Sequence, residues 1–157
     1  MNNRWVIPDV HGCIKTLRYL LEDRIDLQKD DTVFFLGDYI DRGPDSKGLI
    51  DYLMNLQNSG YNIRCIRGNH EDYCIRAWED DQKKILFHSA IEKDWRRNGG
   101  TKTLESFGVK RPRDIDKTYI DWMKKTEYYI RYGDFGDYLK DKDIEAVFSI
   151  SAQLNGH

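Results

Sequence analysis

The sequence predicts an α/β fold in which three short strands form a parallel sheet. Apolar runs rich in β-branched and aromatic residues occur at residues 5–8, 31–37 and 61–66, and each leads into a polar turn that contains glycine. Segments with helical apolar spacing separate these runs, which gives a β-α-β-α-β order. Because such crossovers are right-handed, we expect three parallel neighbouring strands with helices packed on them.

The connecting segments show where the helices should lie. Apolar residues recur at helical spacing from Cys13 to Arg24, and Asp45 or Ser46 can cap a second helix that Gly60 ends. Further helices are expected at 71–81, 82–97, 101–107 and 115–126, and strand character returns at 127–132 and weakly at 146–154. We therefore predict one domain over residues 1–135, with a helical insert at about 71–126, and a divergent tail over 136–157.

Composition limits the classes of protein to which the chain can belong. Its 157 residues suit one domain, and 25 basic against 27 acidic residues leave no basic footprint for a nucleic acid. No apolar stretch approaches the roughly 20 residues that cross a bilayer, and the N-terminus lacks the apolar core of a secretory signal. We expect a cytoplasmic protein without a nucleic-acid or membrane partner. Cys13, Cys65 and Cys74 lack metal-ligand spacing and are expected to be reduced, structural thiols.

The polar turns after the three strands carry side chains that suit a metal site. Asp9 and His11 follow the first strand, Asp38 follows the second and Asn69 follows the third. Carboxylate and amide oxygens bind hard divalent cations, and imidazole adds affinity for Mn, Fe or Zn. Because parallel strands end at one edge of the sheet, these side chains could converge. Asp38, on the middle strand, could then bridge two ions that activate water and hold phosphate oxygens.

Other residues in the same turns suit phosphate chemistry. Arg42 offers a guanidinium fork that matches phosphate oxygens. His70 could protonate a leaving alkoxide while Asp41 orients its imidazole. Glu71 could take part in catalysis, or it could only favour the N-terminus of its helix through the dipole. The acidic run at 79–81 is expected to be a solvated helix face.

Three sequence blocks, in this order, resemble the signature of the calcineurin-like metallophosphoesterases. The blocks are Asp9-x-His11-Gly12, Gly37-Asp38-x-x-Asp41-Arg42-Gly43 and Gly68-Asn69-His70-Glu71. Within that superfamily the chain is most similar to bacterial and phage serine/threonine phosphoprotein phosphatases, a group that includes symmetrical diadenosine tetraphosphate hydrolases. The stretch Trp95-x-x-Asn98-Gly99-Gly100-x-x-Thr103 also resembles a segment of bacterial members. The likeness therefore covers about residues 4–132.

The resemblance implies an α-β-β-α sandwich and a metal-dependent phosphoric ester hydrolase. Its substrate would be a phosphorylated protein or a small phosphoester, attacked directly by a metal-bridging hydroxide without a phosphoenzyme. Two divalent ions are implied, with Mn preferred and Fe, Zn or Ni as alternatives. By this likeness the metal ligands are Asp9, His11, Asp38 and Asn69. His70 would be the general acid oriented by Asp41, and Arg42 would contact the phosphoryl oxygens.

The C-terminal part of the chain departs from the family pattern. Family members carry two further histidine ligands downstream of the region of likeness, and this sequence has neither; His157 is not interpreted as a replacement. We therefore expect an incomplete sandwich, with the first sheet present and the second largely missing, and an incomplete second metal site. Two alternatives to a protein phosphatase stay open: a symmetrical dinucleoside polyphosphate hydrolase, and a truncated, catalytically impaired remnant of such an enzyme.

Overall fold

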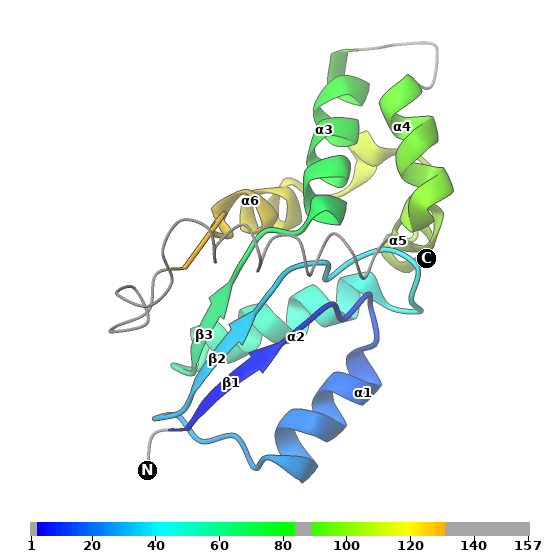
Figure 1. Ribbon diagram of the computed structural model, residues 1–157. Coiled ribbons are helices and arrows are strands. Elements are labelled where there is room, and N and C mark those ends of the chain that lie inside the picture. The colour runs from blue at the N-terminus through cyan, green and yellow to red at the C-terminus, as the bar shows by residue number, and fades with distance from the viewer. Residues whose placement is uncertain (1–2, 84–88, 131–157) are drawn as a thin grey trace.

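A three-stranded parallel sheet forms the centre of the protein, whose computed structural model describes residues 3–83 and 89–130 (Figure 1). The strands are β1 (Arg4–Ile7), β2 (Thr32–Phe35) and β3 (Asn62–Cys65), in the order β1-β2-β3. In the register, Trp5 pairs with Val33, and Val33 pairs with Ile63. All three predicted strands and their parallel pairing are therefore confirmed.

Two crossover helices cover one face of this sheet. They are α1 (Ile14–Arg18), which continues into a π-helical segment (Tyr19–Arg24), and α2 (Ser46–Asn58). The Asp45 side chain caps α2 by accepting a hydrogen bond from Gly48 N at 2.8 Å. Both helices lie on the same side of the sheet in Figure 1. Two successive right-handed crossovers that advance in one direction across a sheet require this placement.

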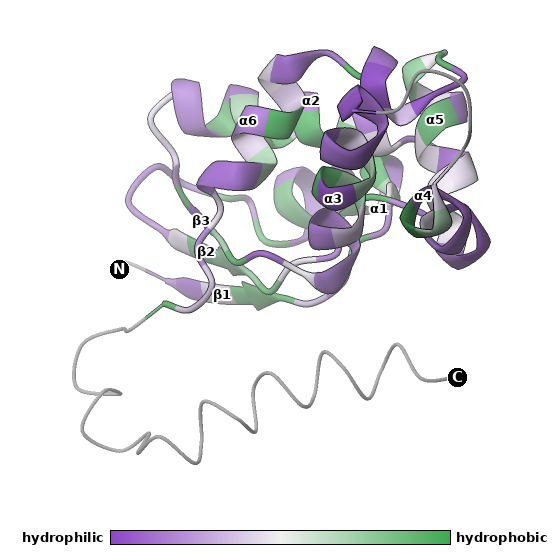
Figure 2. Ribbon diagram, turned by 90° about the horizontal axis from the view of Figure 1, so that it is seen from above, coloured by the Kyte–Doolittle hydropathy of each residue, from purple (hydrophilic) through white to green (hydrophobic). Residues whose placement is uncertain are grey.

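The remaining helices lie beyond the carboxyl ends of the strands, except the last of them. They are α3 (Asn69–Lys83), α4 (Ala90–Trp95), a π-helical segment (Arg96–Gly100), α5 (Thr101–Phe107), a 3-10 turn (Pro112–Asp114) and α6 (Lys117–Lys125). Helix α6 lies beside α2 (Figure 2) and is joined to it by hydrogen bonds from Tyr119 to Asp51 and from Trp122 to Gln57. The helices α3 and α4 pack side by side (Figure 1). The loop ends of the sheet therefore face α3 and α4 (Figure 1), and the helical insert at about 71–126 stays a prediction.

Two helix starts differ from the predicted ones because polar side chains cap them later. Of the helix expected at 82–97, residues 84–88 lie outside the described residues and 82–83 belong to α3. The next described helix, α4, starts after Ser89, whose Oγ accepts a hydrogen bond from Glu92 N at 3.0 Å. The helix expected from residue 115 starts at α6, where the Asp116 carboxylate accepts from Thr118 N at 2.7 Å. Capping of orphan N–H groups outweighs apolar spacing in deciding where these helices begin.

The C-terminal predictions are tested only in part. Of the strand expected at 127–132, the described residues show one parallel bridge, between Ile66 and Glu127. Within residues 3–83 and 89–130 the only sheet has three strands, which agrees with an incomplete sandwich. The weak strand at 146–154, the tail at 136–157 and His157 lie outside the described residues.

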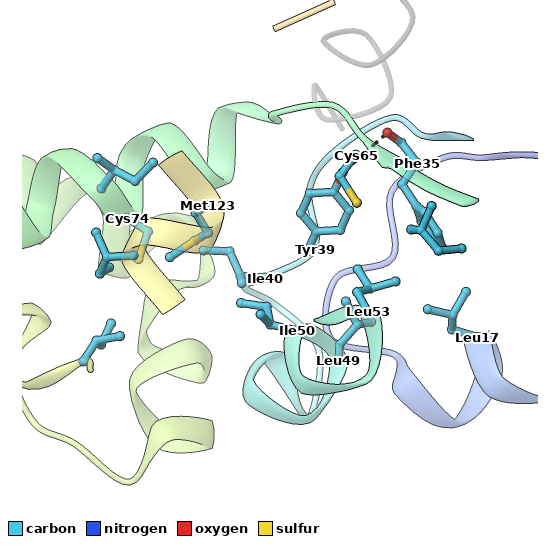
Figure 3. Close-up of a cluster of buried hydrophobic side chains, with 14 of the residues drawn as sticks. Leu17, Phe35, Tyr39, Ile40, Leu49, Ile50, Leu53, Cys65, Cys74 and Met123 are labelled. Atoms are coloured by element: carbon cyan, nitrogen blue, oxygen red, sulfur yellow. Dashed lines mark hydrogen bonds between the residues drawn. The ribbon is translucent and has the colours of Figure 1, made fainter. Parts of the chain in front are cut away.

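The hydrophobic core extends from the space between the sheet and the crossover helices into the helical region, where Cys74 and Met123 are buried (Figure 3). All four residues of β2 are buried, whereas burial alternates along β3, and Leu49 and Leu53 occupy one face of α2. Each such buried side chain contributes about 1.5–3 kcal/mol of transfer free energy. Tyr39 is also fully buried, and its hydroxyl donates to Ile66 O at 2.6 Å. The turn that follows β2 is therefore anchored in the core.

Hydropathy and cysteine burial vary from one part of the fold to another. Hydrophobic colour marks β1 and β2, whereas much of α3 is hydrophilic (Figure 2). Among the described residues no helix combines the length and the apolar character needed to cross a membrane. Cys65 and Cys74 are buried, as structural thiols should be, whereas Cys13 is exposed.

Asp81 on α3 corrects the prediction that residues 79–81 form a solvated face. Its side chain is only 1% exposed. Arg113 donates to it from Nη2 at 2.9 Å and from Nε at 3.1 Å, and Arg111 Nη2 donates as well. Burial disfavours the Asp81 carboxylate, but the hydrogen bonds from Arg113 and Arg111 outweigh burial and lower its pKa to about 2. This buried cluster ties α3 to the segment that precedes α6.

The lowered pKa of Asp81 predicts a specific loss of stability in acid. Since the unfolded pKa is about 3.9, the carboxylate stabilises the fold above roughly pH 4, and this contribution of about 2–3 kcal/mol is lost as the pH falls toward 2. Urea unfolding between pH 5 and pH 2.5 measures the loss. In the Asp81→Asn variant the free energy of unfolding should change less over that window, and an unchanged slope would contradict the prediction.

Candidate metal centre

The turns after β1 and β2 are joined by backbone hydrogen bonds. Val10 N and His11 N both donate to Asp38 O, at 3.2 and 2.9 Å, and Gly12 N donates to Tyr39 O at 2.7 Å. These bonds continue the pairing of the two strands beyond their ends. The predicted ligands of the first two blocks are consequently brought to one edge of the sheet.

Strained backbone is concentrated in these turns. Among the described residues, positive φ angles at positions other than glycine occur at five places, and four belong to the predicted site: His11 (42°), Asp38 (53°), Asp41 (69°) and Arg42 (62°). Such conformations cost on the order of 1 kcal/mol or more each. They persist only where the surroundings determine them, and here they occur at four residues of the predicted site in two short turns.

The turn after β3 approaches the same edge through Gly68. A Cβ atom at this position would lie 2.1 Å from Asp38 Oδ1 and 2.4 Å from Asp38 N, so only glycine fits. Two residues later, His70 N donates to Asp38 Oδ1 at 3.1 Å. Asn69, between them, is the first residue of α3 and is exposed. The third block therefore meets the second at Asp38.

Glu71 joins these turns by accepting hydrogen bonds from their backbone N–H groups. Its side chain is fully buried, with Oε1 accepting from Tyr39 N (2.8 Å) and Ile40 N (3.3 Å), and Oε2 accepting from Asp38 N (2.9 Å) and Gly68 N (2.9 Å). Burial and the charge of Asp38 raise the pKa of Glu71 to about 8, and the backbone donors act in the opposite direction. These hydrogen bonds give Glu71 a structural role that differs from both the catalytic role and the helix-dipole role that the sequence suggested.

Three side chains converge on a point where a metal ion could sit. One ligand atom from each of His11, Asp38 and His70 lies within 4.8 Å of the others. His11 Nδ1 lies 2.7 Å from Ile40 O, so this nitrogen carries the proton and Nε2 keeps its lone pair. This is the tautomer that a metal ligand needs.

Asp9 supplies an independent sign that the centre suits a cation. Its Oδ1 atom is buried and has no hydrogen-bond partner. Burial, together with the charge of Asp38, raises the pKa of Asp9 above its ordinary value. An unsatisfied buried carboxylate oxygen is costly, and a divalent cation would satisfy it. The mixture of carboxylate and imidazole donors fits Mn, Fe or Zn.

His70 and Asp41 form a buried pair beside this centre. His70 Nδ1 lies 2.7 Å from Asp41 Oδ2, and both side chains are at most 2% exposed. Burial disfavours the imidazolium, but the hydrogen bond and charge of Asp41 prevail and raise the pKa of His70. The ring of His11 stands edge-on to that of His70, with centroids 4.8 Å apart. Arg42 is exposed, and its Nη1 lies 3.2 Å from His11 Nε2.

The structure adds residues to this site to which the sequence assigned no role. Trp95 Nε1 donates to Asp41 Oδ2 at 2.9 Å, and Thr103 Oγ1 donates to Asp41 Oδ1 at 2.5 Å. Ser46 Oγ accepts from Asp41 N at 3.1 Å. The stretch from Trp95 to Thr103 was recognisable by its resemblance, but nothing in its pattern indicates that it contacts Asp41, 54 residues earlier.

A parallel sheet whose loop edge gathers carboxylates and imidazoles defines an α/β protein with a candidate metal centre. Comparison with known proteins makes the class specific: the chain belongs to the calcineurin-like phosphoesterase family, whose model matches residues 3–156. Members of this metallophosphoesterase family are hydrolases that use divalent metals. The family and the fold class predicted from the sequence are confirmed.

Two curated relatives and one solved structure illustrate the similarity. Serine/threonine-protein phosphatase 1 of Salmonella typhimurium is 37% identical over 97 residues, which cover 61% of this chain and 38% of that protein. A symmetrical bis(5'-nucleosyl)-tetraphosphatase of Buchnera aphidicola is 36% identical over 120 residues, covering 76% and 36%. A metallophosphoesterase structure from Sphaerobacter thermophilus shares the fold, with a TM-score of 0.50 at 18% identity, covering 83% and 43%. The chain thus spans less than two-fifths of the length of either curated relative.

Proposed function

We propose that this site hydrolyses phosphate esters in a metal-dependent reaction, with a phosphorylated serine or threonine of a protein as the preferred substrate. The observation that carries the proposal is the convergence of His11, Asp38 and His70 within 4.8 Å, beside the unsatisfied Oδ1 of Asp9. Family membership supports the reaction class. The Salmonella relative, which is named a serine/threonine-protein phosphatase, supports the substrate.

The proposed ligands of the divalent ions are Asp9, His11, Asp38 and Asn69. Manganese is the preferred ion, and Fe, Zn or Ni are alternatives. When bound, such ions supply Lewis-acid chemistry, which activates water and neutralises charge on the phosphoryl group. Asp38 is central because its backbone carbonyl accepts the N–H of His11, from the first turn, and its Oδ1 accepts the N–H of His70, next to Asn69 in the third.

The other residues act on the phosphoryl group and on the leaving group. Arg42 would bind phosphoryl oxygens through its guanidinium. Since His70 Nδ1 is engaged by Asp41, its Nε2 is the nitrogen that can pass a proton to the leaving oxygen. This division of roles requires no nucleophilic side chain.

A second substrate class has its own support. The alignment with the Buchnera dinucleoside tetraphosphatase covers more of this chain than that with the Salmonella phosphatase, 76% against 61%. Both substrates present a phosphoryl group to the same centre, so the choice depends on neighbouring surfaces. Comparing kcat/KM for a phosphoserine peptide with that for diadenosine tetraphosphate tests the preference. A higher value for the dinucleotide would replace the proposed substrate.

Hydrolysis of p-nitrophenyl phosphate by the full chain tests the reaction itself. We expect turnover with added Mn²⁺, loss on chelation and recovery when Mn²⁺ is restored. Asp38→Asn serves as the blank, because an amide in place of the carboxylate cannot neutralise a cation. Turnover no greater than that of Asp38→Asn would reject the proposal and favour the impaired remnant.

A further inference from the structure

Asp41 is held by more groups than its pairing with His70 requires. Its Oδ2 accepts from both His70 Nδ1 (2.7 Å) and Trp95 Nε1 (2.9 Å), and its Oδ1 accepts from Thr103 Oγ1 (2.5 Å). Its backbone N donates to Thr103 Oγ1 (2.9 Å) and Ser46 Oγ (3.1 Å). Asp41, Trp95 and Thr103 are all 0% exposed. Both oxygens of the carboxylate are therefore fixed by donors other than the imidazole.

The segment from Trp95 to Thr103 is shaped to make this contact. It runs from the end of α4 through the π-helical segment into α5, and Gly99 within it has a φ of 112°. A Cβ atom at Gly99 would lie 2.8 Å from Arg42 N and 2.8 Å from Arg42 Cγ. Gly99 O also accepts from Arg42 N at 3.3 Å. The segment thus closes directly on the turn that carries Asp41 and Arg42.

Orientation of Asp41 is the property that these contacts control. A carboxylate with one partner can rotate about its Cβ–Cγ bond and move the acceptor away from the imidazole. Donors placed on both oxygens remove that freedom before any substrate binds. Small displacements of a proton donor reduce rates strongly, because catalysis depends on the geometry of the transferring group.

We propose that Trp95 and Thr103 are positioning residues for proton transfer by His70, acting through the Asp41 carboxylate. This inference rests on the proposed function of the site. It extends that function to two residues on a different part of the chain. Their effect is confined to the step in which the leaving oxygen receives a proton.

Leaving groups of different basicity isolate that step. Phenolate from phenyl phosphate needs protonation, whereas 2,4-dinitrophenolate departs without it. For Trp95→Phe and for Thr103→Val we expect kcat with phenyl phosphate to fall by about 10-fold to 100-fold. With 2,4-dinitrophenyl phosphate kcat should change by less than about twofold, and KM should stay constant for both substrates.

Two further variants separate positioning from simple packing. Thr103→Ser keeps the hydroxyl donor, so its kcat with phenyl phosphate should stay at the wild-type level, unlike that of Thr103→Val. Trp78→Phe makes the same change in size at a remote indole, which donates to Ile115 O at 3.1 Å, and should leave both rates unchanged. Equal losses on both substrates for Trp95→Phe, or an equal loss for Trp78→Phe, would overturn the inference.

The imidazole itself gives a readout that does not depend on turnover. In two-bond ¹H–¹⁵N spectra of the metal-free chain, His70 should show a protonated Nδ1 in wild type, and altered Nδ1 and Nε2 shifts in the Trp95→Phe/Thr103→Val double variant. Unchanged His70 shifts would reject the positioning role. If the wild-type chain were as inactive as Asp38→Asn, the proposed function would be rejected. The spectra would still show whether Trp95 and Thr103 position the His70 imidazole.

Discussion

Replacing His70 with Asn should lower kcat for phenyl phosphate by about 10²-fold to 10⁴-fold, the usual contribution of a general acid. Asn can donate from its amide to Asp41, as Nδ1 of the imidazole does across 2.7 Å, so the buried pair is kept while the transferable proton is lost. Steady-state kinetics at saturating Mn²⁺ measure the effect. With 2,4-dinitrophenyl phosphate the loss should be much smaller.

The same variant separates two roles for His70, because its imidazole also belongs to the cluster with His11 and Asp38. If His70 instead binds a metal, His70→Asn should lower turnover of both substrates alike and raise the Mn²⁺ concentration needed for half-maximal activity. An unchanged Mn²⁺ requirement with a loss confined to the poor leaving group supports proton transfer. Thermal unfolding of the variant shows whether the fold is retained.

Glu71→Gln should cause the largest loss of stability, about 3–5 kcal/mol in the free energy of unfolding. The buried carboxylate accepts four backbone N–H groups, two on each oxygen. An amide presents one oxygen and one NH₂ group, so two of these donors would face another donor. Each buried donor left without an acceptor costs about 1–3 kcal/mol. Urea unfolding at pH 9, above the raised pKa of Glu71, measures the difference.

A matched control lies on the same helix. Glu79 is 45% exposed and pairs with Lys124, so Glu79→Gln should change the free energy of unfolding by no more than about 0.5 kcal/mol. A similar small effect for Glu71→Gln would show that the turns do not depend on this carboxylate. Because those turns position Asp38, the destabilised variant should also lose hydrolytic activity.

Much of the fold could be predicted because its signals are local. Strand composition, helical spacing and the block order at Asp9, Asp38 and Asn69 are read within short windows, and together they give the sheet and the candidate ligands. The placement of Glu71 could not be read in this way. Its acceptors are directed at backbone N–H groups up to 33 residues earlier, and a backbone amide leaves no trace in the sequence.

Partners distant along the chain explain the other differences. Asp81 looks like part of a charged surface run, but Arg111 and Arg113, at least 30 residues later, enclose it. Trp95 and Thr103 lie 54 and 62 residues from Asp41, so their hydrogen bonds depend on how α4 and α5 return to the sheet. Only assembled tertiary structure shows which polar residues share a buried environment.

The left-handed backbone at His11, Asp38, Asp41 and Arg42 affects how the thermal stability of this protein could be increased. Glycine would adopt such angles at a lower local cost, but at Asp38 and Asp41 it would also remove the acceptors of buried hydrogen bonds from His70 and Trp95. The strained angles are therefore maintained by the same contacts that set the geometry of the site. Substitutions intended to raise thermal stability should therefore be placed in the outer helices and not in these turns.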